Sequence, residues 1–159
     1  MLNYTRGRRG FKDHLLYYLQ SMLPAILSII AYDIWFYISH VILHDREVYK
    51  YHKQHHEKPI PQFLDTYHSH WIESPFQSLG FFVPMGFLAY SAKDILTALI
   101  ILNIRGMMRH DERGVYLIGN HHLLHHLHPS YNFGEYWLDS LCGTLYPKQE
   151  EYRAGLLYM

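Results

Sequence analysis

A long apolar run near the start of the chain limits the folds that are open to it. Residues 15–43 read LLYYLQSMLPAILSIIAYDIWFYISHVIL, with Pro24 and Asp33 inside the run. At about 1.5 Å per residue, a helix of this length exceeds the roughly 30 Å of a bilayer core. The run therefore predicts a membrane helix over 15–44 with a kink at Pro24. A buried helix of a soluble protein is the alternative. A cleaved signal peptide fits poorly because no small-residue cleavage site follows.

A second apolar region, residues 75–108, is divided into two halves by the sequence Ser-Ala-Lys-Asp at 91–94. Each half has roughly 15 residues, which is short for a full crossing. We expect either an apolar hairpin that dips into the membrane and returns, or two tilted helices in a thinned bilayer. In both cases the segments before and after this region lie on the same side of the membrane.

Histidine-rich stretches occupy 45–73 and 109–146, on either side of the apolar region. With a basic tail at 1–14 and a tail at 147–159, the 159 residues fit a single domain. The expected fold class is all-α, a membrane helical bundle with a histidine-rich helical cap. Basic residues near the cap place it in the cytosol by the positive-inside rule: Arg46, Lys50, Lys53, Lys58, Arg105, Arg109 and Arg113. The basic N-terminal tail competes with this assignment and leaves the orientation of the N-terminus open.

Charge and cysteine content exclude several functions. Lys+Arg and Asp+Glu balance at 14 each, so no general electrostatic attraction favours nucleic acid as a partner. Cys142 is the only cysteine, which rules out an internal disulfide and any thiolate cluster. The chain has 14 histidines, so a bound metal would be held by imidazole and oxygen ligands.

Eight histidines stand in three groups at helical spacing: His40 and His44; His52, His55 and His56; His122, His125 and His126. Residues three and four apart lie on one face of a helix, which is how two or three imidazoles reach one ion. A solvated or pH-sensing histidine patch would not need the same triplet twice. The repeated spacing therefore predicts that these eight residues are metal ligands.

Other candidates for the site stand alone in the sequence. His110 directly follows the second apolar region and is favoured as a ninth ligand. His121 shares a helix face with His125 and is a candidate for a further ligand or for a partner of the ligands. His70 and Glu73 are three residues apart and are candidates for the same two roles.

Asp33 lies near the middle of the predicted membrane helix, where an ionisable residue costs a few kcal/mol and usually marks a function. It is too far along the helix to bond His40. It would orient a ligand on another helix, contact the substrate path, or form a structural hydrogen bond between helices. Three other histidines are expected at interfacial, capping or surface positions: His14, His68 and His128.

Nine candidate imidazoles are more than one tetrahedral or octahedral ion can use, so the sequence predicts a dinuclear site. Neutral imidazole suits zinc, copper and iron alike. A redox metal beside a membrane can reach a lipid chain, and inert C–H bonds need an activated oxygen species that iron and O₂ generate and zinc does not.

The sequences HVILH, HKQHH and HHLLHH resemble the histidine boxes of the fatty acid hydroxylase and sterol desaturase superfamily of integral membrane di-iron oxygenases. A membrane segment precedes the first box and an apolar hairpin the last. The resemblance runs from about Asp33 to Tyr146 and includes YNFG at 131–134 and WLDSLCGT at 137–144. By position it implies the same nine histidines as ligands of two iron ions.

The resemblance also implies an activity: O₂-dependent hydroxylation or desaturation of a fatty acyl or sterol-like lipid, with electrons from cytochrome b5 or a ferredoxin-type donor. It implies an integral membrane protein, in the endoplasmic reticulum where the cell is eukaryotic. The chain departs from the family in two ways. It is shorter, so a homo-oligomer would be one way to complete the lipid tunnel, and fewer polar residues surround His110 than the family often has there.

Two other functions compete with the oxygenase. The same histidines could hold zinc in a membrane protein with a structural or non-redox role, because ligand type alone does not choose the metal. A histidine-rich proton relay in a transporter would spread ionisable groups through the membrane segments, and only Asp33 and the Lys93-Asp94 pair lie there. The relay is therefore the weaker alternative.

Overall fold

The structure is a computed structural model that describes the backbone of residues 11–157 and the side chains of residues 22–157. Residues 1–10 of the predicted basic tail lie outside the described residues, as does the side chain of His14.

Between residues 11 and 157 the chain is helical and contains no strand, which confirms the predicted all-α class. The α-helices are α1 (Phe11–Leu43), α2 (Glu73–Phe82), α3 (Ala92–Arg109), α4 (Val115–Ile118), α5 (His121–Leu127) and α6 (Tyr136–Cys142). Short 3₁₀ turns join them at Tyr49–Tyr51, His55–Glu57, Phe63–Tyr67, Val83–Gly86, Glu112–Gly114 and Gln149–Glu151.

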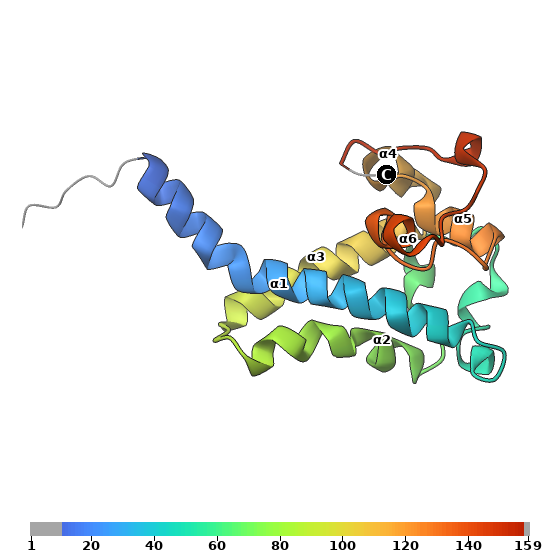
Figure 1. The fold of residues 1–159 in the computed structure, drawn as a ribbon, viewed down its shortest axis with the longest axis horizontal. Coiled ribbons are helices and arrows are strands. Elements are labelled where there is room, and N and C mark those ends of the chain that lie inside the picture. Colours follow the sequence, from blue (N-terminus) through green and yellow to red (C-terminus); the bar gives the residue numbers. More distant parts are fainter. Residues whose placement is uncertain (1–10, 158–159) are drawn as a thin grey trace, which may run out of the picture.

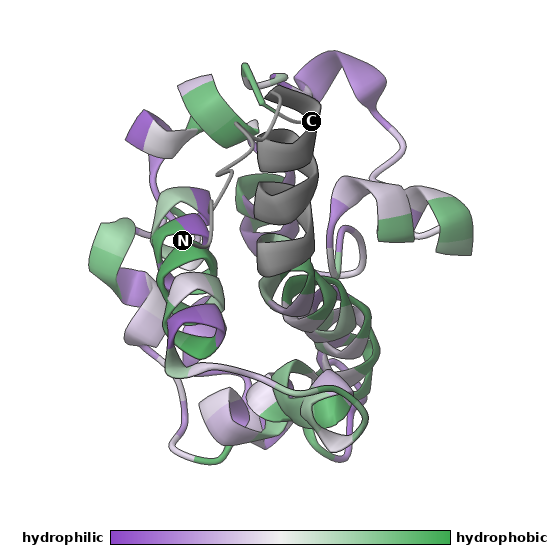
Figure 2. Ribbon diagram, turned by 90° about the vertical axis from the view of Figure 1, so that its left-hand side faces the viewer, coloured by the Kyte–Doolittle hydropathy of each residue, from purple (hydrophilic) through white to green (hydrophobic). Residues whose placement is uncertain are grey.

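The first helix, α1, has the length and composition of a membrane span. It contains Pro24, and Figure 1 shows it changing direction in its N-terminal half, as a proline inside a helix predicts. Among the described residues, Met22–Leu43 is the one helical segment long and apolar enough to cross a membrane. Its exposed apolar side chains recur every three or four residues: Leu23, Ile26, Ile30, Ile34, Ile38 and Val41. Figure 2 shows mainly hydrophobic residues along the part of this helix whose side chains are described.

Helices α2 and α3 form the returning pair in the second apolar region, and both run beside α1 (Figure 1). Helix α3 begins at a capping box. The Ser91 hydroxyl accepts from the Asp94 backbone N–H at 3.2 Å, and the Asp94 carboxylate accepts from the Ser91 N–H at 2.8 Å. The polar sequence that divides the apolar region therefore starts α3, whereas α2 has already ended at Phe82. As a result, the end of α1, the start of α2 and the end of α3 lie at the same end of the molecule.

The three long helices pack through small residues. Ala25, Phe81 and Ala98 form the buried core between α1, α2 and α3. A Cβ at Gly80 would lie 2.2 Å from the Trp35 Cβ, so glycine is what lets α2 approach α1 this closely. The Trp35 indole N–H donates to the Phe76 carbonyl at 2.7 Å and fixes the same contact.

The C-terminal part of the chain covers the end of the bundle where α1 stops (Figure 1). Asn120, just before α5, connects two segments of this C-terminal part by hydrogen bonds to Arg153. Its N–H donates to the Arg153 carbonyl at 3.1 Å, and its side-chain oxygen accepts from the Arg153 N–H at 2.8 Å. Helix α6 ends at Gly143, whose φ of 71° is a left-handed conformation that favours glycine. The chain after α6 therefore folds back over α5.

Replacing Gly80 by alanine is expected to lower the free energy of unfolding by about 1–2 kcal/mol, because the new methyl group would overlap Trp35. This clash outweighs the roughly 1 kcal/mol that alanine gains over glycine in a helix. Thermal unfolding of the purified protein in detergent measures the change. Gly86→Ala is the matched control, since a Cβ there meets nothing within 4 Å. Equal melting temperatures for the two variants would contradict this packing.

Candidate metal centre

Nine histidines gather into two adjacent groups at the covered end of the bundle. Cluster A consists of His40, His44, His52, His56 and His125. Cluster B consists of His55, His110, His122 and His126. Within each cluster, one ring nitrogen of every histidine lies within 4.8 Å of those of all the others. These are the nine histidines that the sequence predicts as ligands, and the structure places every one of them in a cluster.

The clusters take residues from elements far apart in the sequence. His40 lies in the last turn of α1, and His110 is the residue that caps the end of α3. Each histidine triplet is divided between the two clusters, which differs from the expectation that one helix face serves one ion. The first triplet lies in and beside the turn His55–Glu57, not in an α-helix. The triplet in α5 is divided as well. His125 groups with the histidines at the end of α1, whereas His122 and His126 group with His110 at the end of α3.

The spacing of the ring nitrogens fits a metal ion. In cluster A the Nε2 atoms of His40 and His52 are 3.0 Å apart, and those of His44 and His125 are 3.1 Å apart. In cluster B the His110 Nε2 lies 3.1 Å from the Nε2 atoms of both His55 and His122. For a metal–nitrogen distance of about 2.1 Å, neighbouring ligands of an octahedron lie about 3.0 Å apart and those of a tetrahedron about 3.4 Å.

Backbone carbonyls fix which ring nitrogen carries the proton. His125 Nδ1 lies 2.6 Å from the Tyr131 carbonyl oxygen, and His110 Nδ1 lies 2.7 Å from the Gly106 carbonyl oxygen. His40 Nδ1 makes the same contact with the Phe133 carbonyl. A carbonyl only accepts, so Nδ1 carries the hydrogen and Nε2 of the neutral ring has a lone pair.

The lone pairs of these rings therefore point toward one another inside the clusters. Two such nitrogens about 3 Å apart repel unless a cation lies between them. His52 has the same arrangement when Glu73 is ionised, since its Nδ1 lies 2.9 Å from Glu73 Oε1. Histidines that bind metals characteristically donate their other N–H to a carbonyl or carboxylate in this way. The residues present therefore fit a metal ion in each cluster.

Burial keeps the cluster histidines in the neutral form that a metal needs. It is the largest cause that lowers the pKa of His52 and of His126 to about 2 and that of His56 to about 4, from 6.5. Neighbouring imidazoles add to the effect because adjacent rings resist being charged together. These rings are therefore neutral at neutral pH, with no proton for a metal ion to displace from the ligating nitrogen.

The remaining candidates lie outside both clusters. Neither Glu73 nor His121 belongs to a cluster. Glu73 contacts His52 of cluster A, and His121 Nε2 lies 3.0 Å from Asp139 Oδ2. His70 stacks on Trp71. His128 caps α5 and His68 pairs with Glu57 near the surface, which are the peripheral positions expected for them.

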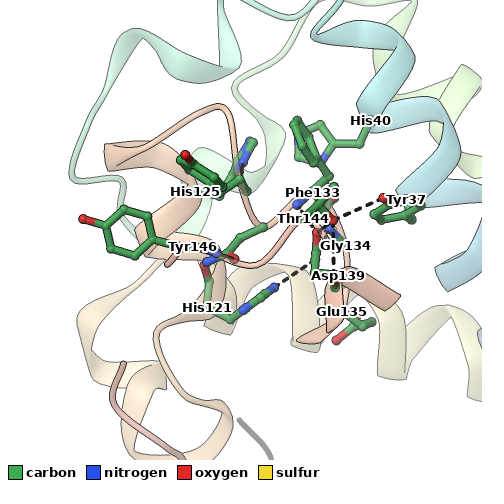
Figure 3. Close-up of polar contacts among 12 residues, drawn as sticks. Tyr37, His40, His121, His125, Phe133, Gly134, Glu135, Asp139, Thr144 and Tyr146 are labelled. Carbon is green, nitrogen blue, oxygen red and sulfur yellow. Dashed lines mark hydrogen bonds and ion pairs between the residues drawn. The ribbon is translucent and has the colours of Figure 1, made fainter. Parts of the chain in front are cut away.

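Asp139, which the spacing argument does not find, holds the segment that supplies two of the carbonyls (Figure 3). Its buried carboxylate accepts from the N–H groups of Phe133 and Gly134, both at 2.8 Å, and from the Thr144 hydroxyl at 2.7 Å. With His121 this makes four partners. In the sequence, only the WLD segment of the family resemblance points to Asp139, and it does not indicate which groups the carboxylate binds.

Asp33 belongs to a buried ion network. Arg105 donates to both oxygens of the Asp33 carboxylate and lies 3.4 Å from Glu135, which Arg109 also contacts. The network joins α1 and α3 to the residue that precedes α6. Of the alternatives for Asp33, the structure therefore shows a structural contact between helices, in the form of an ion pair. Glu135 and Arg109 carry no pattern that predicts this role.

A cavity of about 290 Å³ lies between α1, α2 and α3, next to cluster B. His55 and His110 line it, and Tyr32 and Phe36 of α1 contribute to its wall. On α3 the wall includes Leu99 and Leu102. The cavity therefore extends from the histidines to helices that carry exposed apolar side chains, such as Phe82 and Leu99.

A helical fold with a membrane-type helix and two adjacent clusters of neutral imidazoles defines a candidate dinuclear metalloprotein of the membrane. The chain belongs to the fatty acid hydroxylase family, whose model matches residues 25–144. This confirms the resemblance seen in the histidine boxes.

Three curated relatives are similar to the chain. It is 29% identical over 142 residues to a Delta(7)-sterol 5(6)-desaturase of Eremothecium gossypii, covering 84% of this chain and 40% of that protein. It is 29% identical over 145 residues to human lathosterol oxidase, covering 83% and 48%. It is 38% identical over 52 residues to rat methylsterol monooxygenase 1, covering 32% and 18%. The chain thus spans less than half the length of these relatives. No solved structure matches it.

Replacing Asp139 by asparagine is expected to weaken metal binding at cluster A selectively. Asparagine cannot accept all four hydrogen bonds, so the carbonyls that orient His40 and His125 lose their support. Loss of such a partner typically weakens metal binding 10- to 100-fold. Titration of the metal-free protein with Co²⁺, followed by visible absorption, measures both sites.

Cluster B is the internal control, because Gly106 of α3 orients its His110. Glu150→Gln, which changes an exposed carboxylate, is the external control and should bind two ions like the wild type. Equal weakening of both clusters in Asp139→Asn would contradict a specific role at cluster A.

Proposed function

We propose that this chain is a membrane oxygenase that binds two iron ions, one in each cluster, and hydroxylates or desaturates a C–H bond of a lipid. The lipid is fatty acyl or sterol-like, and the reaction uses O₂ with electrons from a donor such as cytochrome b5 or a ferredoxin. Membership of the fatty acid hydroxylase family supports this activity, as do the names of the sterol desaturase and monooxygenase relatives.

The observation that carries the proposal is the pair of imidazole clusters beside a cavity between α1, α2 and α3. Cluster A offers five nitrogens, one more than the tetrahedral set that structural zinc usually takes. Neighbouring nitrogens 3.0–3.2 Å apart also suit an octahedral ion better than a tetrahedral one. These two features favour iron over zinc.

The two clusters differ in their contact with the cavity. Cluster B has four imidazoles, and two of them, His55 and His110, line the cavity, so an iron ion held there would lie next to a bound lipid. Iron bound there would supply the O₂ activation that an inert C–H bond requires. The chain contributes the apolar wall of Tyr32 and Phe36, which binds the hydrocarbon and excludes water. The Nδ1–H bonds to backbone carbonyls hold the ligating rings in place.

Activity is tested on protein loaded anaerobically with iron. We expect O₂ uptake that depends on both an electron donor and a lipid extract, with products that have gained one oxygen or lost two hydrogens. His125→Ala should abolish the uptake, because it removes a cluster A ligand whose carbonyl partner is fixed. His68→Ala, a histidine paired with Glu57 near the surface, is the matched control and should retain activity. Zinc alone in the purified protein, with no O₂ uptake after iron reconstitution, would support the non-redox alternative.

We also propose that the chain resides in the endoplasmic reticulum where the cell is eukaryotic, with both clusters facing the cytosol, because basic residues such as Arg46, Lys50 and Lys53 lie close to the histidines in the sequence. Cys142, exposed at the end of α6, reports this orientation. In sealed microsomes with their cytosolic face outward, a membrane-impermeant maleimide should label the wild type without detergent. Cys142→Ser should stay unlabelled, because Cys142 is the only cysteine of the chain. Labelling only after permeabilisation would place the clusters on the lumenal side.

A further inference from the structure

Residues 60–71, between the second histidine group and α2, form a surface segment rich in exposed apolar side chains. The exposed fraction is 70% for Ile60, 68% for Leu64, 56% for Tyr67 and 77% for Trp71. Leu64 and Tyr67 are three residues apart in one 3₁₀ turn, so they lie on the same side of it. Apolar side chains exposed this densely indicate contact with a protein, a ligand or a membrane.

The opposite side of this turn is attached to α3. The Thr66 hydroxyl oxygen lies against Gly106 of α3, where an added Cβ would be 3.1 Å from it. Thr66 also lines the cavity beside cluster B. The turn is therefore held with one side on the bundle, and its apolar side chains are left on the outside.

The segment lies at the level where the apolar exterior of α3 ends. The Tyr67 hydroxyl donates to the Asn103 side-chain oxygen at 2.9 Å. Ile100 and Ile104, on either side of Asn103 in the sequence, are exposed apolar residues of α3, and the helix ends at Arg109. Tyr67 therefore lies beside the last apolar turn of a helix in the second apolar region.

The start of α2 lies at the same end of the bundle. Trp71 is two residues before Glu73, the first residue of α2, and Leu79 and Phe82 are exposed further along this helix. At about 1.5 Å per residue, Leu79 lies about 9 Å beyond Glu73 along the helix axis. The exposed apolar surface thus extends from α2 and α3 to residues 60–71. Tryptophan and tyrosine are the residues that membrane proteins place at the level of the lipid headgroups.

The segment also satisfies its own polar groups, as contact with lipid requires. The Gln62 N–H donates to Asp65 Oδ2 at 2.8 Å, and the Phe63 N–H donates to Asp111 Oδ2 at 3.0 Å. Asp65 is the only carboxylate in residues 60–71, and Lys58 pairs with it at 2.6 Å. The first N–H groups of the turn and its one acidic side chain are therefore not left for water to solvate.

We propose that residues 60–71 form a membrane-contact surface, inserted among the lipid headgroups with Leu64, Tyr67 and Trp71 at the boundary of the acyl chains. A bilayer is favoured over a protein partner because this surface continues the apolar exteriors of α2 and α3. The inference goes beyond the proposed function, since it depends neither on the metal nor on the reaction. Because Tyr67 also lines the cavity, the insertion places this edge of the cavity at the level of the headgroups.

Depth is measured with a nitroxide spin label on the full chain in phospholipid nanodiscs, loaded with zinc, which is diamagnetic. Trp71→Cys and Leu64→Cys are each made in the Cys142→Ser background, which removes the only native cysteine. At both positions the label should collide more with O₂, which dissolves in lipid, than with a water-soluble nickel chelate. The ratio should give a depth of about 5–10 Å within the headgroup and acyl boundary.

Glu150→Cys in the same background is the matched control, because Glu150 is an exposed residue of another 3₁₀ turn and should collide mainly with the nickel chelate. Leu64→Cys also guards against a local change at Trp71, which stacks on His70. Collision with the nickel chelate as frequent as in the Glu150→Cys protein would show that the segment faces water. Low collision with both reagents would show that protein covers it, as in contact with a second copy. Either result at Leu64 overturns the inference.

Discussion

The hydrogen bonds from histidine Nδ1 atoms to backbone carbonyls are the interaction on which the rest of the centre depends. A free imidazole can rotate and can carry its proton on either nitrogen, so nine rings near one another do not by themselves form two metal sites. The carbonyls of Gly106, Tyr131 and Phe133 remove this freedom for His110, His125 and His40. Two of these carbonyls lie in the segment held by the Asp139 carboxylate. The C-terminal part of the chain is therefore what gives the histidines of α1 and α5 a common direction.

The buried ion network fixes the position of α1 and α3 relative to this C-terminal part. Burying two arginines and two carboxylates costs desolvation free energy that mutual attraction repays only when each group is paired. Asp33, Arg105, Glu135 and Arg109 meet this condition as a connected set without net charge. Since Glu135 is two residues from Phe133, the network positions the same segment that orients His40. Its contribution is the relative placement of α1, α3 and the segment before α6, which apolar contacts alone specify weakly.

The sequence was sufficient for the features that repeat along the chain and insufficient for those that depend on a partner far away. The apolar runs predict the long helices, and the repeated spacing predicts the nine histidines that the structure gathers. The division of each triplet between two clusters was not predicted. His55 lies in a 3₁₀ turn, where α-helical periodicity does not apply, and in α5 a shared helix face does not show that two sites lie side by side along it. His121 shows the same limit. Its helix face allows it to be a ligand, and only Asp139, 18 residues later, shows that its Nε2 is already occupied. Glu135 is a single polar residue with no periodic signal, and its burial follows from packing.

Helix packing distant from the histidines also determines the geometry of cluster A. The contact of Gly80 with Trp35, and the bond from Trp35 to the Phe76 carbonyl, fix how far along α1 the helix α2 lies. Glu73 is the first residue of α2, so the same contact determines where its carboxylate meets His52. His40, on the last turn of α1, then lies 3.0 Å from His52. A shift of α2 along α1 by one residue, about 1.5 Å, would separate these rings by more than a metal ion tolerates. The small residues between the long helices therefore help to determine the geometry of the metal centre, although none of them contacts a histidine nitrogen.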